Sequence, residues 1–181
     1  DNFKELMSDP DLSEKTEMLA VDRPGYGYSG FGKSVPEIGE QARLLRPLLD
    51  SLDRPAVFVG HSYGGPVAVR LAAEFPEKCR ALVLLAGAFD PDNERSFWVN
   101  KPADWFFVRP FVPAALRVAN DEKLAHPDEL RKMQAFWAKI TVPTVILQGD
   151  ADRLVPEING PFAQKMLVNT PAELQIIPNQ N

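Results

Sequence analysis

Short apolar runs recur along the sequence and constrain its fold more than any other feature. They occupy residues 18–21, 56–59, 81–85, 145–147 and, interrupted by Gln175, residues 174–177. Continuous rather than alternating apolarity is typical of strands covered on both faces, as in a parallel sheet. The runs therefore predict a mostly parallel sheet with flanking helices.

Segments with helical periodicity separate these runs. The first lies between residues 21 and 56, where one helix face would collect apolar side chains at Ile38, Ala42, Leu45, Leu49 and Leu52. Two more helices are expected at residues 64–75 and 157–168. Because strands and helices alternate, the predicted fold class is α/β.

Residues 90–139 interrupt this alternation, because connections in such folds usually contain only a few residues. The segment holds all three tryptophans of the chain. It is too aromatic for a solvated loop, and one long helix is disfavoured by Pro102, Pro110, Pro113 and Pro127. We therefore expect an inserted helical cap at residues 90–139, between core segments at residues 1–89 and 140–181.

One helix within the cap is expected to begin with Pro127 in its first turn. Its apolar stripe comprises Leu130, Met133, Phe136, Trp137 and Ile140. A stripe with this spacing more often packs on the body of a protein than contacts a ligand, so packing is the expectation.

Composition excludes several classes of protein. With 45% hydrophobic and 25% charged residues, the chain is neither disordered nor fibrous. Its formal charge of −5 and lack of a basic cluster argue against a nucleic-acid partner. Cys79 is the single cysteine, so neither a disulfide framework nor a cysteine-based zinc site is expected. No apolar stretch approaches the roughly 20 residues of a membrane span. A cytoplasmic location is favoured over secretion, and the oligomeric state is left open.

A glycine-flanked serine follows the apolar run at residues 56–59. Gly60, Ser62 and Gly64 form a Gly-x-Ser-x-Gly motif between a predicted strand and a predicted helix. Glycine at positions 60 and 64 would avoid collisions where helix and strand approach closely, and the turn would expose the Ser62 hydroxyl. The N–H of Tyr63 would point at an oxygen that becomes negative during acyl transfer. The alternative is a purely structural glycine turn.

A nucleophilic serine needs a base and a carboxylate. Of the two histidines, His61 is expected to point away from Ser62, and His126 to occupy a surface or N-terminal helix position, so neither is a convincing base. Asp150 and Asp152 follow a strand, where parallel sheets gather catalytic groups, and Asp150 is expected to shape the turn through local hydrogen bonds. A second carboxylate candidate is the pair Asp90 and Asp92, which are otherwise turn formers.

Three segments together resemble the α/β-hydrolase family, specifically its cap-bearing, serine esterase-like members, over nearly the whole chain. Residues 22–29, Asp-Arg-Pro-Gly-Tyr-Gly-Tyr-Ser, are similar to the segment after the family's fourth strand. Residues 60–65 resemble its nucleophile elbow, and residues 149–156 its acid-bearing turn. The resemblance implies Ser62 as nucleophile, the Tyr63 N–H as an oxyanion donor and Asp152 as the acid, with no metal or organic cofactor.

The implied reaction is hydrolysis of an ester or related acyl substrate through an acyl-enzyme, because related dehalogenases and epoxide hydrolases have aspartate at the elbow. The substrate would be a small molecule whose apolar part contacts cap aromatics, namely Trp98, Trp105, Phe106 and Phe107. Three alternatives remain open: a non-catalytic binding protein or receptor on this scaffold, an acyltransferase, and a hydrolase of carbon–carbon or amide bonds.

The family's remaining parts are expected outside this sequence, which starts at Asp1 without methionine and stops at Asn181 after an apolar run. The resemblance places the catalytic histidine in a loop after the last strand, and a second oxyanion donor in a loop before Asp1. It also places a strand between the runs at residues 18–21 and 56–59. Residues 1–181 alone are therefore expected to be inactive, with a split sheet.

Overall fold

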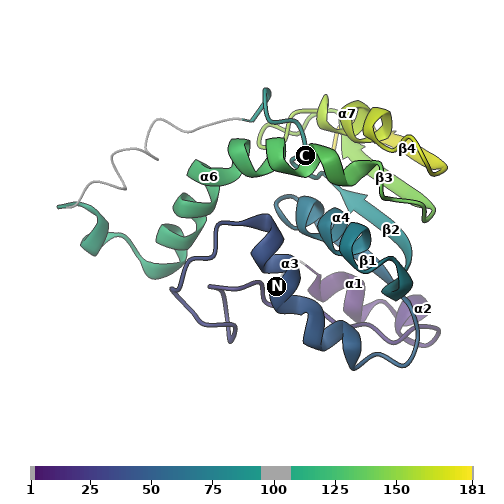
Figure 1. The fold of residues 1–181 in the computed structure, drawn as a ribbon, viewed down its shortest axis with the longest axis horizontal. Coiled ribbons are helices and arrows are strands. Elements are labelled where there is room, and N and C mark those ends of the chain that lie inside the picture. The colour runs from purple at the N-terminus through teal and green to yellow at the C-terminus, as the bar shows by residue number, and fades with distance from the viewer. Residues whose placement is uncertain (1–2, 95–106, 181) are drawn as a thin grey trace.

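The computed structural model describes residues 3–94 and 107–180 (Figure 1). Trp98, Trp105 and Phe106, which we expected to contact substrate, lie outside these residues. The elements follow in the order α1 (Lys4–Ser8), α2 (Pro10–Ser13), α3 (Ile38–Asp50), β1 (Ala56–His61), α4 (Gly64–Glu74), η1 (Pro76–Lys78), β2 (Cys79–Leu85), η2 (Arg109–Phe111), α6 (Ala114–Trp137), β3 (Thr144–Gly149), α7 (Asn159–Met166) and β4 (Ala172–Ile177).

The strands form one parallel sheet in the order β1-β2-β3-β4. This confirms the α/β class and the strands expected at four of the apolar runs. The helices expected at residues 38–52 and 64–75 form nearly as predicted, as α3 and α4. The third, α7, is shorter than the expected span of residues 157–168.

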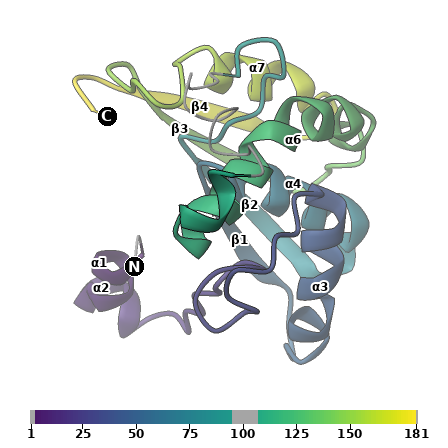
Figure 2. The same ribbon diagram turned by 90° about the vertical axis from the view of Figure 1, so that its left-hand side faces the viewer.

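The described helices cover mainly one face of the sheet, which differs from the expected burial on both faces. The strand order runs in one direction, so right-handed crossovers place α4, α6 and α7 on the same side. Figure 2 shows α3, α4 and α6 on that side and α1 and α2 beyond the other. Burial therefore alternates along β1, where Phe58 is buried and Val57 is 51% exposed.

The strand expected at residues 18–21 is not formed. This segment has no regular secondary structure, and Leu19 is 62% exposed. A strand needs a neighbour to satisfy its N–H and C=O groups. Residues 18–21 pair with none of the described strands, and β1 lies at an edge of the sheet. Apolar composition alone was therefore a poor indicator of a strand here.

The turn between β1 and α4 brings helix and strand backbones together. A Cβ atom at Gly60 would lie 2.6 Å from the Gly64 carbonyl oxygen and 2.8 Å from the Gly65 Cα. At Gly65 it would lie 2.9 Å from the Phe89 ring, but at Gly64 it would meet nothing within 4 Å. The steric reason predicted for Gly60 is confirmed. The same reason for Gly64 is wrong, because the close approach involves the following residue.

Residues 90–139, where we expected the cap, include one 24-residue helix, α6, with Pro127 in its interior. The prediction that prolines prevent a long helix, and that Pro127 lies in a first turn, is wrong. Pro110 lies in η2 and Pro113 is the residue before α6, so neither interrupts that helix. A proline inside a helix removes one backbone hydrogen bond and bends the helix, and α6 changes direction along its length (Figure 1).

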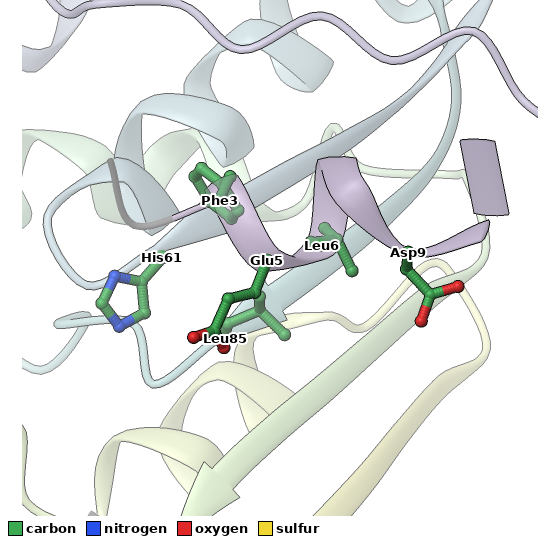
Figure 3. Close-up of a pocket in the computed structure, with 6 residues that line it drawn as sticks. All are labelled: Phe3, Glu5, Leu6, Asp9, His61 and Leu85. Carbon is green, nitrogen blue, oxygen red and sulfur yellow. The ribbon is translucent and has the colours of Figure 1, made fainter. Parts of the chain in front are cut away.

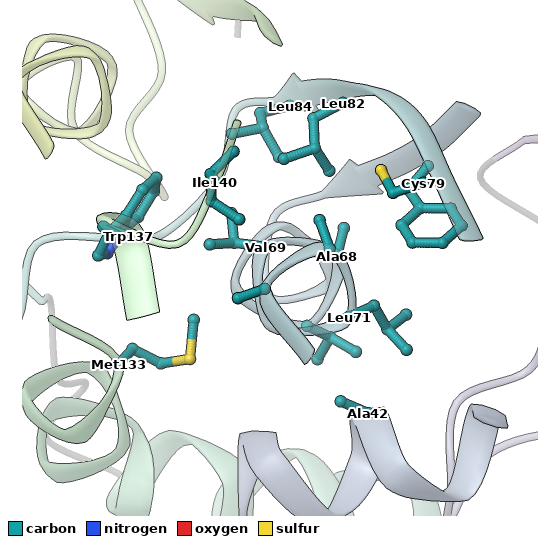
Figure 4. Close-up of a cluster of buried hydrophobic side chains, with 14 of the residues drawn as sticks. Ala42, Ala68, Val69, Leu71, Cys79, Leu82, Leu84, Met133, Trp137 and Ile140 are labelled. Atoms are coloured by element: carbon teal, nitrogen blue, oxygen red, sulfur yellow. The ribbon is translucent and has the colours of Figure 1, made fainter. Parts of the chain in front are cut away.

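Burial of the second half of α6 explains why the helix continues past its proline. The expected apolar stripe packs on the core, with Leu130, Met133, Trp137 and the following Ile140 buried, as Figure 4 shows for the last three. The Trp137 ring meets Phe89 edge-on, with centroids 5.3 Å apart. The proline penalty of about 3 kcal/mol is comparable with the stabilisation from burying one or two such side chains. Within the described residues, no helix is long and apolar enough to cross a membrane.

Replacing Trp137 with alanine is expected to lower the free energy of unfolding by about 3–5 kcal/mol, because it leaves a large cavity between α6 and the sheet. Leu116→Ala, at an exposed position of the same helix, should change it by less than about 0.5 kcal/mol. Urea denaturation of both variants measures the difference, and equal effects would show that α6 is not part of the core.

Gly60→Ala and Gly64→Ala form a matched pair at the turn after β1. The added methyl group at position 60 must displace backbone, so we expect a loss of about 1–3 kcal/mol in the free energy of unfolding. The same methyl group at position 64 enters open space and should change it by less than about 0.5 kcal/mol. Thermal or urea melts test the pair, and a larger loss at position 64 would contradict this packing.

Candidate active site

The candidate residues lie at the carboxyl edge of the sheet, where β1, β2 and β3 all end. Ser62 follows β1, Asp90 lies beyond the end of β2, and Asp152 follows β3. Adjacent strands are about 4.8 Å apart, so the β1 and β3 ends are separated by roughly 10 Å. Parallel pairing thus brings the serine-bearing and aspartate-bearing turns to the same edge, although they are far apart in the sequence.

Ser62 has left-handed backbone geometry, with φ of 51°. A non-glycine residue in this region typically stores about 1–3 kcal/mol of strain, which the surrounding structure must hold. Here the Ser62 N–H donates to the Leu85 carbonyl at 3.0 Å, and the Ser62 carbonyl accepts from the Gly65 N–H at 3.0 Å. The side chain is half-buried, and its hydroxyl has no hydrogen bond to the described residues. A strained turn therefore presents an uncommitted hydroxyl.

The Tyr63 N–H lies directly before the first turn of α4 and has no hydrogen-bond acceptor among the described residues. A free N–H at a helix N-terminus is suited to bind a negative oxygen. The Tyr63 side chain, by contrast, is well held, because its hydroxyl donates to the Pro36 carbonyl at 2.9 Å. Burial, aided by the charge of Glu122, raises the pKa of this phenol well above its usual range, so it remains a hydrogen-bond donor.

The two aspartates after β3 divide their roles differently from expectation. Asp152 makes the local bonds, since its Oδ1 accepts from the N–H groups of Leu154 and Val155, both at 2.8 Å. Asp150 instead accepts from the distant Asn179 N–H at 2.7 Å, which ties the turn to the residues after β4. The expectation of local bonds for Asp150 is therefore wrong. The Asp152 Oδ2 accepts no hydrogen bond from the described residues.

Asp90 shapes a turn after β2. Its Oδ1 accepts from the Asp92 N–H at 3.0 Å, and its Oδ2 accepts from the Asn93 side chain at 2.8 Å. Both oxygens of Asp90 are thereby committed to neighbouring residues. The turn-former alternative that we kept open for Asp90 is the one that the structure favours.

His61 is exposed at the end of β1. It lines a hollow between α1 and the sheet, with Phe3, Glu5, Leu6, Asp9 and Leu85 (Figure 3). Ser62 is not among the residues that line this hollow. The arrangement agrees with the expectation that the two neighbouring side chains point in different directions.

His126 is buried, with 1% exposure, and the expectation of a surface or N-terminal position is wrong because α6 continues through Pro127. Its Nδ1 lies 3.2 Å from the Glu94 carboxylate, which also accepts from Lys123. Burial would raise the pKa of Glu94, but hydrogen bonds and charge from His126 and Lys123 outweigh it and lower that pKa. Among the described residues, the His126 Nε2 has no hydrogen-bond partner.

Sequence reasoning missed a buried polar cluster beside the turn. Arg23 and Glu122 form an ion pair at 2.5 Å, and Gln41 and Tyr26 donate to the same carboxylate. The signal was present in α6, where Val118, Glu122, His126 and Leu130 recur every four residues and share a face. Polar residues within a helical apolar stripe indicate a buried polar contact.

Of the cap aromatics expected to contact substrate, only Phe107 is described, and it is 82% exposed. Within the described part of the chain, no group of three or more histidine, cysteine, aspartate or glutamate side chains is arranged to hold a metal ion.

Comparison of this chain with known proteins finds a matching family model and several relatives. The family model of the alpha/beta hydrolase fold matches residues 1–113. The chain is 30% identical to a poly(3-hydroxyalkanoate) depolymerase of Ectopseudomonas oleovorans, over 93% of this chain and 68% of the depolymerase. It is 34% identical to lipase LipV of Mycobacterium tuberculosis, over 82% of this chain and 52% of the lipase, so it spans about half of that relative.

A solved structure extends the likeness to three dimensions. The monoacylglycerol lipase of Paleococcus ferrophilus superposes with a TM-score of 0.66 at 17% identity, over 87% of this chain and 72% of the lipase. At this identity the likeness concerns the fold alone. Together with the family match over more than half of the chain, it agrees with the sheet, the strained turn and the resemblance of the three motifs. The chain belongs to the α/β-hydrolase fold family.

Proposed function

We propose that the full-length protein is a serine hydrolase that cleaves esters through an acyl-enzyme. The observation that carries this proposal is the left-handed backbone of Ser62 between β1 and α4, with its hydroxyl uncommitted. Strain of this kind is typical of functional sites, and a structural turn at this place would be less strained with glycine.

In the proposed reaction, the Ser62 Oγ attacks the substrate carbonyl carbon while a histidine base takes the hydroxyl proton. The negative carbonyl oxygen is stabilised by the Tyr63 N–H, and collapse of the intermediate expels the alcohol, which receives the proton from the imidazolium. Water then attacks the acyl-enzyme by the same route, which releases the acid and restores Ser62. Asp152 stabilises the imidazolium through its uncommitted Oδ2.

The base is proposed to come from beyond residue 181, at the same edge of the sheet. A loop after β4 would adjoin the Asp152 turn, because β4 pairs with β3. His61 lines the hollow beside α1, and the Nδ1 of His126 faces Glu94 while its ring lies against Tyr63. We therefore assign the base to neither of these two histidines.

The proposed substrate is an ester of a small molecule or short chain with an apolar part. Support comes from the relatives in sequence, which are named as a poly(3-hydroxyalkanoate) depolymerase and a lipase. We propose residues 90–139, which include α6, as the cap over this substrate, with residues 1–89 and 140–181 as the core.

A non-catalytic binding protein on the same scaffold is the main rival. It would need neither a strained serine nor an aspartate with a spare oxygen. Ligand affinity without turnover in the full-length protein would favour this rival. Transfer of the acyl group to an added alcohol or thiol in preference to water would instead identify an acyltransferase.

Ser62→Ala is expected to abolish both hydrolysis of a short-chain p-nitrophenyl ester and labelling by a fluorophosphonate, because each reaction needs a bond to the Ser62 Oγ. Ser51→Ala, which removes an exposed hydroxyl after α3, should leave both unchanged. Ester assay and in-gel fluorescence measure the two activities. Labelling that persists in Ser62→Ala would overturn the assignment of the nucleophile.

Asp152→Asn should lower the turnover number by about 10⁴-fold while leaving the fold intact, because an amide neither orients the histidine nor stabilises its charge. Asp150→Asn keeps an oxygen that accepts the Asn179 N–H and should retain most of the activity. Steady-state kinetics with circular dichroism separate the two outcomes. Equal activities in the two variants would remove Asp152 from the mechanism.

A further inference from the structure

The side chain of Tyr63 is held by groups from several distant segments. The Arg23 guanidinium lies 4.5 Å from its ring centroid, and the His126 ring lies 4.6 Å away at an angle of 34°. The Tyr63 hydroxyl donates to the Pro36 carbonyl at 2.9 Å. This side chain belongs to the residue whose N–H lies beside Ser62, so whatever fixes the ring also limits rotation of that backbone.

Arg23 is in turn fixed by Glu122. Both terminal guanidinium nitrogens donate to the Glu122 carboxylate, at 2.5 and 3.1 Å, and one of them also donates to the Gln41 side-chain oxygen at 2.9 Å. Such a two-point contact sets the plane of the guanidinium as well as its position. The orientation of Arg23 against the Tyr63 ring is therefore determined by a residue of α6.

The Glu122 carboxylate is itself fully engaged. Besides Arg23, it accepts from the Gln41 amide at 2.8 Å and from the Tyr26 hydroxyl at 2.7 Å, and its side chain is 3% exposed. Burial, with the Glu122 charge adding to it, raises the pKa of Tyr26 well above its usual range, so this hydroxyl remains a donor. The cluster joins residues 22–29, α3, the turn before α4 and α6 in one fixed geometry.

Stability alone is a poor reason for this arrangement. Removing two charges from water carries a desolvation cost that their mutual attraction often only balances. Apolar side chains of similar volume in the same place frequently stabilise a protein equally well or better. What a buried ion pair with several partners supplies is a defined geometry. An oxyanion donor needs such a geometry, since small displacements of a catalytic group cost much of the rate.

We propose that Arg23 and Glu122 are positioning residues for the Tyr63 N–H, and that the cap helix α6 thereby sets the geometry of the oxyanion site. The inference rests on the proposed function, because it assigns the Tyr63 N–H to the transition state. It adds that the cap acts on the chemical step, in addition to covering the substrate.

The test compares Glu122→Gln with Asp121→Asn in the full-length protein. Asp121 is the neighbouring residue on α6 and accepts from both terminal nitrogens of Arg109, at 2.7 and 2.8 Å, so it is a matched ion pair outside the Tyr63 cluster. We would measure labelling by a fluorophosphonate as a function of probe concentration. This gives a maximal rate constant and a half-saturating concentration separately.

Glu122→Gln should lower the maximal labelling rate at least about tenfold, a part of the roughly 10²–10³-fold that loss of a whole oxyanion donor costs. The half-saturating concentration should change less than the rate, and Asp121→Asn should match the wild type in both. Arg23→Lys, which keeps the charge but loses the two-point contact, should resemble Glu122→Gln and provides a second variant if the first folds poorly. A maximal rate equal to wild type in either folded variant would overturn the proposal.

A double variant distinguishes positioning through Tyr63 from a general loss of stability. Tyr63→Ala removes the ring but keeps the N–H, so it should reproduce the loss in Glu122→Gln, and the two changes together should cost no more than one. If the two losses in labelling rate multiply in the double variant, Glu122 does not act through the Tyr63 ring, and the proposal is contradicted.

The Tyr63 amide resonance in NMR spectra provides a readout that needs no catalysis. It should shift in Glu122→Gln and stay in place in Asp121→Asn. An unchanged resonance in Glu122→Gln would contradict the proposal, whereas a shift in a protein that the probe never labels would place the failure in the proposed function.

Discussion

The close approach of β1 and α4 is the contact on which the rest of the site depends. Gly60 lies so near the carbonyl of Gly64 that no side chain fits between the strand and the helix. This approach forces the chain to reverse within a few residues, and Ser62 takes the left-handed geometry that the reversal requires. Hydrogen bonds to Leu85 and Gly65 hold it there. A half-buried hydroxyl and a backbone N–H, both without hydrogen-bond partners among the described residues, thus result from backbone packing.

The sheet supplies the second half of the site through its topology. Parallel strands end at the same edge of the sheet, so the turns after β1 and β3 lie at one edge although their strands do not pair. The fixed spacing of strands sets the turns that carry Ser62 and Asp152 two strand widths, or roughly 10 Å, apart. Helix α6 adds a third constraint, because its buried Glu122 reaches Tyr63, the residue next to Ser62, through Arg23.

The sequence predicted those features that depend on local pattern. The apolar runs identified four strands, the periodicity identified α3 and α4, and the motif at residues 60–65 identified the strained turn. Failures occurred where distant contacts outweigh local preference. Residues 18–21 are apolar but have no neighbouring strand in the described structure, and Pro127 is tolerated because the residues after it bury their stripe in the core. His126 and the Arg23–Glu122 pair depended on knowing where α6 packs.

The most direct test of this account is a crystal structure of the full-length protein after reaction with a fluorophosphonate. The account predicts a covalent bond from phosphorus to the Ser62 Oγ, with a phosphonyl oxygen about 2.7–3.1 Å from the Tyr63 nitrogen. An adduct on another residue, or a Ser62 adduct whose oxygen points away from that nitrogen, would contradict it.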